Sequence, residues 1–85
     1  MEIANGATLL AALPVYAGTP TPKWWVIMAI RSDITGEHQR YVTACVNDLS
    51  DRSWYWGHYF DRQETALLDA YARAKLLGQF ALKEE

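Results

Sequence analysis

A chain of 85 residues has room for one domain with a core of modest size. Its formal charge of −2, from eight Lys and Arg against ten Asp and Glu, lacks the basic excess typical of proteins that bind nucleic-acid phosphates. Cys45 is the only cysteine, which excludes an internal disulfide and favours a reducing compartment such as the cytoplasm. We therefore expect a single domain over residues 1–85.

Residues 1–22 predict a short helix followed by a proline-rich linker. Asn5 can cap a helix through GATLLAAL, which Pro14 would end, and AGTPTP at 17–22 has the composition of a linker. The apolar start does not resemble a signal peptide, because Glu2 stands where basic residues are expected and Pro14 interrupts the run. No segment approaches the roughly 20 apolar residues needed to span a bilayer, so we expect no membrane partner.

Residues 23–60 predict three strands, at 23–31 (KWWVIMAIR), 40–47 (RYVTACVN) and 54–60 (WYWGHYF). Their short polar connections favour an antiparallel meander. Residues 61–80 predict a helix that begins with a capping box of Asp61 and Glu64. Along one face of this helix we expect Leu67, Ala70, Tyr71, Ala74 and Leu77. The predicted fold is α+β in the order α-β-β-β-α, with a three-stranded antiparallel sheet packed on the C-terminal helix.

Side-chain alternation assigns the residues to the two faces of this sheet. If Val42 lies opposite Ile30, then Val42, Ala44 and Val46 share a face with Trp54, Trp56 and His58, and this face takes the helix. The other face would present aromatic rings with polar tips around Gly57, a composition favoured at recognition surfaces. The predicted partner-binding residues are Trp25, Arg31, Tyr41, Tyr55 and Tyr59. Two alternatives remain: these rings pack for stability alone, or the N-terminal helix covers them.

The sequence offers few groups for catalysis. Cys45 and His58 are the only candidates for a nucleophilic pair, and the expected register places them on opposite faces. His38, His58 and Cys45 lack the spacing of a metal site, and the aspartates fit turns and caps. No phosphate-binding glycine loop is present. We therefore predict a protein that is not an enzyme and that holds no cofactor or metal.

Two resemblances concern nucleic-acid binding. The α-β-β-β-α order is similar to the double-stranded-RNA-binding domain, which implies contacts from a lysine cluster that opens the last helix; here DRQETALLD offers only Arg62. Three strands followed by GHYFDRQETALLDAYARA resemble the arm-type DNA-binding domains of phage integrases. Those domains read DNA with basic and aromatic residues of the sheet, where this chain offers Arg31 and either Arg40 or Arg52.

Residues 40–74, with RYVTACVN, WYWGHYF and the following helix, resemble small accessory proteins of bacteriophages and prophages. That resemblance implies a protein that binds and inhibits or redirects a host protein, including a host-defence enzyme. The predicted function is therefore a non-catalytic phage-type inhibitor or adaptor that binds a host protein, in the bacterial cytoplasm, through its aromatic sheet face. The alternative is a nucleic-acid-binding domain that stacks bases on the same rings. An unoccupied aromatic face also predicts a homodimer.

Overall fold

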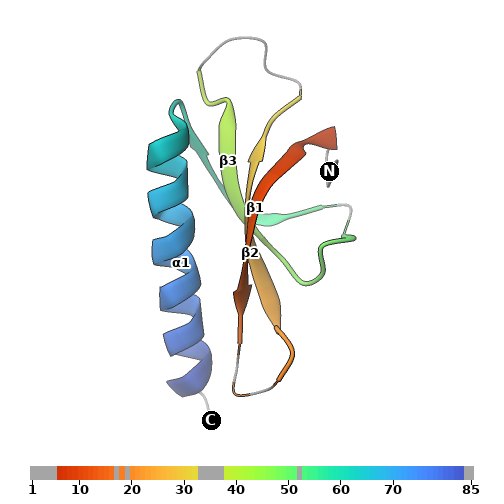
Figure 1. Cartoon of the computed structure of the whole chain (residues 1–85), viewed down its shortest axis with the longest axis vertical. Coiled ribbons are helices and arrows are strands. Elements are labelled where there is room, and N and C mark those ends of the chain that lie inside the picture. The colour runs from red at the N-terminus through yellow and green to blue at the C-terminus, as the bar shows by residue number, and fades with distance from the viewer. Residues whose placement is uncertain (1–5, 17, 19, 33–37, 52, 84–85) are drawn as a thin grey trace.

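The computed structural model describes residues 6–16, 18, 20–32, 38–51 and 53–83, with side-chain surroundings up to residue 78. Four strands precede one helix: β1 (Thr8–Val15), β2 (Trp24–Ile30), β3 (Tyr41–Val46), β4 (Tyr55–Phe60) and α1 (Gln63–Lys83). The strands form one antiparallel sheet in the order β1-β2-β3-β4, and α1 lies along one face of it (Figure 1). The α+β class is confirmed, with four strands and one helix.

The prediction of an N-terminal helix is wrong, because its residues form β1. This strand pairs with β2 from Thr8 opposite Ile30 to Val15 opposite Trp24. A short apolar run is compatible with either a helix or a strand, and here the extended pairing with β2 stabilises the strand. Pro14 is tolerated because β1 is an edge strand, where an amide that faces away from the sheet needs no partner. Asn5, the expected cap, lies outside the described residues.

The other predicted elements are confirmed to within a few residues. The linker predicted at 17–22 falls between the end of β1 and the start of β2, and the Lys23 amide closes this hairpin by donating to the Val15 carbonyl at 2.8 Å. The helix begins at Gln63, with the Arg62 carbonyl accepting from the Ala66 amide at 3.2 Å. The predicted capping box is therefore wrong.

The carboxylate of Asp61 has a different role from the predicted cap. Its Oδ1 accepts a hydrogen bond from the Gln39 amide at 2.5 Å and lies 3.4 Å from Nδ1 of His38. Asp61 thus ties the start of the helix to the turn before β3.

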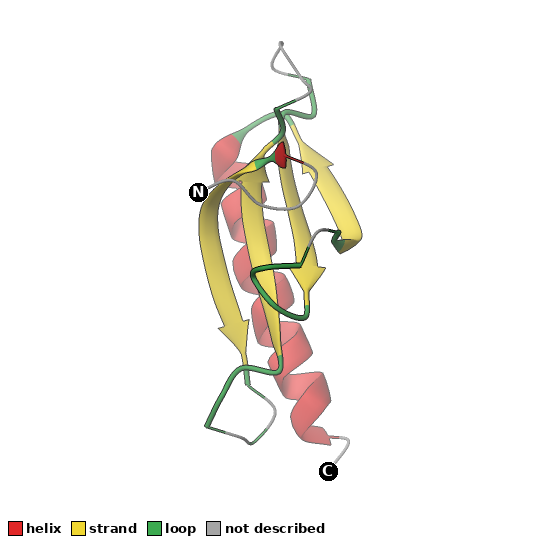
Figure 2. Ribbon diagram, turned by 90° about the vertical axis from the view of Figure 1, so that its right-hand side faces the viewer, coloured by secondary structure: helices red, strands yellow, loops and turns green. Residues whose placement is uncertain are grey.

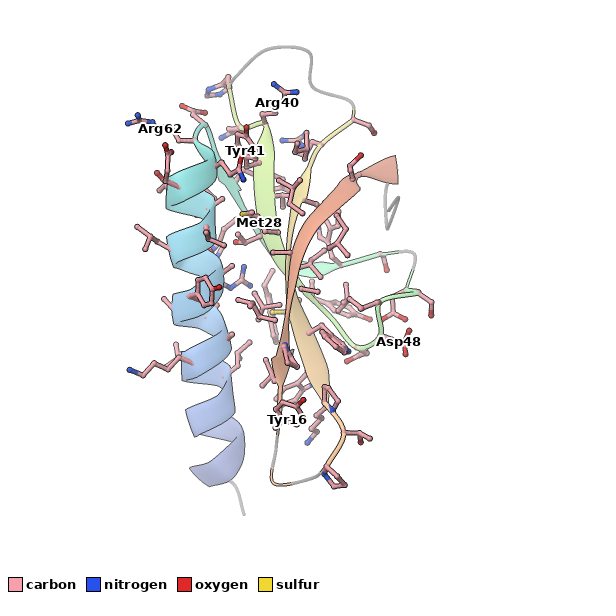
Figure 3. The ribbon with its side chains drawn as sticks, viewed as in Figure 1. Tyr16, Met28, Arg40, Tyr41, Asp48 and Arg62 are labelled. Carbon is pink, nitrogen blue, oxygen red and sulfur yellow. The ribbon has the colours of Figure 1, made fainter. Side chains whose placement is uncertain are left out.

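The register of the central strands differs by one residue from the predicted one. Val42 pairs with Ala29, and Tyr41 pairs with Ile30. Because side chains alternate, this offset exchanges the two faces of β3 relative to the prediction. Thr43 and the other odd-numbered residues of β3 face α1, and the valines that were predicted to face it lie on the opposite side. Figure 3 shows Met28, the partner of Thr43, on the side of α1.

We call the sheet face opposite α1 the far face. It carries a buried apolar cluster from the first strand region to the end of β3: Ala7, Ile27, Ala29, Val42, Ala44 and Val46. Partly buried side chains pack against this cluster from several segments, namely Leu9, Ala12, Trp25, Leu49 and Trp54. The connection from β3 to β4 crosses this face, as Figure 2 shows. The far face is thus a second small core and is not the open aromatic surface that the sequence predicts.

Small side chains let α1 approach the other face closely. Ala66 and Ala70 are fully buried against the sheet, and Ala74 and Leu77 pack beside Val26 and Cys45. Tyr71, which was predicted to share this buried stripe, is exposed.

Candidate functional site

An irregularity in β4 shapes the surface beside α1. Cys45 pairs with Tyr55 and Thr43 pairs with His58, so two residues of β4, Trp56 and Gly57, stand opposite one residue of β3. This is a β-bulge, in which the extra residue bends the strand and increases its twist. Trp56 therefore leaves the alternation that would have placed it in the core, and its indole is 71% exposed. The prediction that Trp56 is a core residue is wrong.

The backbone at this bulge is strained. Trp56 has a φ of +54°, in the left-handed region that residues with a Cβ adopt at a cost of roughly 1–2 kcal/mol. Gly57 beside it leaves little room for a side chain, because a Cβ there would lie 3.0 Å from the Tyr59 hydroxyl and 3.3 Å from Nε1 of Trp54. The sequence thus places its one strand glycine next to the strained residue and not at it.

Arg73 of α1 holds the bulge in place. Its guanidinium donates to the Trp56 carbonyl at 2.7 Å, to both the carbonyl and hydroxyl oxygens of Thr43 at 3.1 Å, and to Sγ of Cys45 at 3.5 Å. The side chain is only 12% exposed, and Asp69 Oδ2 lies 3.9 Å away. A planar group with five donors suits such a set of acceptors in fixed positions.

Asp69 completes a polar cluster between α1 and the sheet, which we define as Thr43, His58, Asp69 and Arg73. The Thr43 hydroxyl donates to Asp69 Oδ2 at 2.5 Å, and Nδ1 of His58 lies 3.2 Å from the same oxygen. In the part of the chain that the structure describes, no buried polar side-chain atom lacks a partner. The cluster therefore fixes the position of α1 along the sheet.

The chemistry available to this cluster is limited. Cys45 and His58 lie on the same face, so the prediction that the register separates them is wrong. However, each contacts a different partner: Cys45 accepts a hydrogen bond from Arg73, and His58 contacts Asp69. Burial raises the pKa of the Cys45 thiol, and this effect outweighs the lowering of the pKa by Arg73. The thiol is therefore protonated at neutral pH, unlike an activated nucleophile. Among the described residues, no three His, Cys, Asp or Glu side chains gather as metal ligands would.

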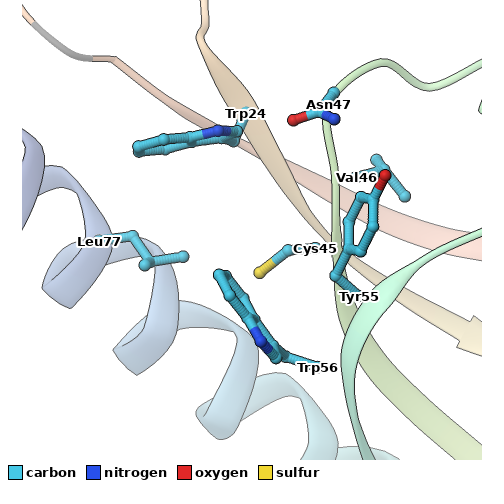
Figure 4. Close-up of a pocket in the computed structure, with 7 residues that line it drawn as sticks. All are labelled: Trp24, Cys45, Val46, Asn47, Tyr55, Trp56 and Leu77. Atoms are coloured by element: carbon cyan, nitrogen blue, oxygen red, sulfur yellow. The ribbon is translucent and has the colours of Figure 1, made fainter.

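An apolar cleft of about 410 Å³ opens next to the bulge. We call it the Trp56 cleft, and its lining residues are Trp24, Cys45, Val46, Asn47, Tyr55, Trp56 and Leu77. Figure 4 shows the indoles of Trp24 and Trp56 on two sides of the cleft, with the Cys45 sulfur directed between them and Leu77 reaching in from α1. Lys23 lies over the ring of Trp24, a lining residue of the cleft, with its charged Nζ 4.9 Å from the ring centroid.

The chain matches no protein-family model, no curated protein and no solved structure. In addition, no helix in the described part of the chain is both long enough and apolar enough to cross a membrane.

The five predicted partner-binding residues do not form one surface. Trp25 and Tyr59 are on the far face, where the Arg31 guanidinium lies 4.7 Å from the centroid of the Tyr59 ring. Tyr41 faces the helix side as the partner of Ile30, half-buried at the other end of the sheet from the cleft. Of the five, only Tyr55 lines the Trp56 cleft.

Sequence reasoning missed Trp24, Trp56 and Leu77 as cleft residues. The one available signal was the dipeptide Trp56–Gly57, because a glycine inside a strand pattern is typical of a bulge.

Proposed function

We propose that this chain is a non-catalytic protein-interaction module that binds an apolar segment of a partner protein in the Trp56 cleft. The observation that carries the proposal is Trp56 itself, whose indole is 71% exposed on a backbone in the left-handed conformation. Backbone strain in folded proteins clusters at functional sites. Exposed tryptophan is also the residue type most enriched among those that contribute most to protein binding.

The shape and lining of the cleft support a peptide segment as its occupant. Two indoles, a leucine and a valine provide apolar surface, and Asn47 and the Tyr55 ring add groups that can hydrogen-bond at the edge. Because Lys23 places a positive charge over the ring of Trp24, which lines the cleft, we expect the partner segment to carry an acidic residue next to its apolar one.

The arrangement of the polar cluster favours binding over catalysis. Thr43 is fully buried, Asp69 and Arg73 satisfy each other and their neighbours, and the Cys45 thiol keeps its proton. We therefore assign these side chains to the support of the cleft. Within this proposal the partner is a host protein in a bacterial cytoplasm, and the chain acts on it as a phage-type inhibitor or adaptor, as the resemblance of residues 40–74 implies.

Nucleic-acid binding through the sheet rings stays the alternative prediction. It requires cations beside exposed rings, and the far-face pair of Arg31 and Tyr59 is one such arrangement. However, Arg31 also donates to the Gln39 carbonyl at 3.2 Å, and the chain carries a net negative charge. Retention on a heparin column at low salt distinguishes the two functions, since the interaction module is expected to flow through.

Selection from a displayed library of random peptides tests the proposal without knowledge of the natural partner. The full chain is immobilised, and the selected peptides are then measured against Trp56→Ala and against Leu10→Ala, which changes an exposed apolar residue of β1 away from the cleft. We expect a shared apolar residue, and binding that Trp56→Ala weakens by about tenfold or more while Leu10→Ala leaves it unchanged. Failure to select any peptide, or equal binding by the two variants, would contradict the proposal.

A further inference from the structure

The helix α1 exposes several large apolar side chains on the side away from the sheet. The side packed on the sheet is built mainly from alanines, together with Leu77, whereas Leu68 is 72% exposed, Tyr71 is 57% exposed and Leu76 is also largely exposed. A surface helix normally shows the opposite distribution, with its apolar stripe on the core and polar residues outside. This outward face is therefore unexplained by the fold of a single chain.

The exposed stripe has a regular spacing with a charge at each end. Glu64, Leu68, Tyr71 and Lys75 follow one another at intervals of four, three and four residues, which places them along one line of the helix. We call these four residues the outer stripe. Its apolar pair lies in the middle, its negative charge lies toward the helix N-terminus and its positive charge lies toward the C-terminus.

Both charges are available to a partner. The Glu64 side chain is 76% exposed and has only a 3.9 Å contact with the equally exposed Arg62. Lys75 is exposed and forms no ion pair with any residue that the structure describes. Neither charge is needed to hold the described fold together.

We infer that the outer stripe pairs with the outer stripe of a second copy of this chain, with the two helices antiparallel. Because Glu64 and Leu68 have the same separation as Tyr71 and Lys75, a two-fold axis between Leu68 and Tyr71 brings each Leu68 opposite a Tyr71 and each Glu64 opposite a Lys75. Because of the two-fold symmetry, the Leu68–Tyr71 contact and the Glu64–Lys75 contact each occur twice in the dimer. A parallel pair would instead align glutamate with glutamate and lysine with lysine, which is unfavourable.

This dimer differs from the sheet-face dimer that the sequence predicts, and it leaves the Trp56 cleft open. Leu77 reaches the cleft from the side of α1 that packs on the sheet, while the outer stripe lies on the reverse side of the same helix. A dimer through the outer stripe thus presents two clefts, which would strengthen binding to a partner with two copies of the recognised segment. The stripe covers about three helical turns, or roughly 16 Å, so the contact is small and we expect a weak dimer.

Sedimentation equilibrium of the full chain, from micromolar to millimolar concentration, tests this inference. The native chain is expected to shift reversibly from monomer to dimer. Glu64→Lys and Lys75→Glu are each expected to weaken the dimer by about tenfold, because each variant replaces two attractive pairs with two repulsive ones. The double variant with both substitutions restores opposite charges at both contacts and is expected to dimerise like the native chain.

Circular dichroism of each variant verifies that α1 has formed. The double variant is a second control of folding, because it contains both substitutions and can dimerise only if neither of them unfolds the chain. A chain that stays monomeric at all concentrations would overturn the inference. A dimer that survives the single charge reversals, or that Tyr59→Ala dissociates, would also overturn it and would place the contact on the far face.

Discussion

The two faces of the sheet achieve burial in different ways. The far face packs its buried aliphatic side chains against two indoles and two leucines, and its buried cluster contains no polar side chain. The face under α1 buries a threonine and most of the Arg73–Asp69 ion pair beside its apolar residues. Arg73 of this pair donates a hydrogen bond to the carbonyl of Trp56 at the bulge. Apolar burial supplies stability without requiring exact geometry, whereas a satisfied polar cluster fixes one arrangement. We infer that the far face stabilises the domain and that the helix side positions the Trp56 cleft.

Two neighbouring tryptophans give the sharpest contrast between these roles. Trp54 packs on the far-face core, so Trp54→Ala is expected to lower the free energy of unfolding by about 3–5 kcal/mol. Trp56 is largely exposed, so Trp56→Ala is expected to change it by less than about 1 kcal/mol. Denaturant titration of both variants measures this difference. Equal losses would show that both indoles belong to the core.

Removal of the guanidinium tests the polar side of the comparison. Arg73→Met keeps much of the side-chain volume but leaves the Trp56 carbonyl and Asp69 without their charged partner. The expected loss is about 3 kcal/mol, because a mostly buried carboxylate is then uncompensated. The double variant Asp69→Asn with Arg73→Met is expected to lose less than the sum of the single losses. Additive losses, measured by the same titration, would contradict a cluster that acts as one unit.

The Cys45 thiol, which lines the cleft, is expected to make a smaller contribution to the stability of the fold, and this contribution depends on pH. Since burial raises the pKa of Cys45 in the folded chain, the folded state holds this proton more tightly than the unfolded state. The resulting stability is fully present below the pKa of the unfolded thiol, about 8.5, and is lost as the pH rises through the folded value. We expect iodoacetamide to modify the folded chain much more slowly than the chain in urea at neutral pH. Equal rates would mean that the thiol is neither buried nor protonated.

The sequence predicted the helix and most of the strands better than it predicted how these elements pair and which of their faces are buried. Aromatic and β-branched runs identified three strands, and the periodicity after Asp61 identified the helix, because these patterns depend on local spacing. The run Thr8–Val15 was misjudged because its strand conformation depends on pairing with a segment that the local pattern does not reveal.

The assignment of faces failed for a related reason. Both sides of β3 are nearly free of charge, so a shift of one residue changes every contact without violating the pattern. The absence of any charged residue from WWVIMAI and YVTACV was itself a signal that both faces are buried. The polar cluster could not be predicted from the sequence. It joins Thr43 to Asp69 and Arg73, which follow it by 26 and 30 positions in the chain, and these residues meet only because α1 packs on the sheet.

The central claim is that Trp56 is held in a strained conformation for binding and not for folding, and the unfolding free energy of Trp56→Gly tests it most directly. Glycine adopts the left-handed conformation without the clash that a Cβ causes, which favours the folded state, although its greater freedom in the unfolded chain offsets part of the gain. We predict a variant as stable as the native chain or more stable by up to about 1 kcal/mol, as measured by denaturant titration. A loss of about 2 kcal/mol or more would contradict the claim, because it would show that the indole stabilises the fold.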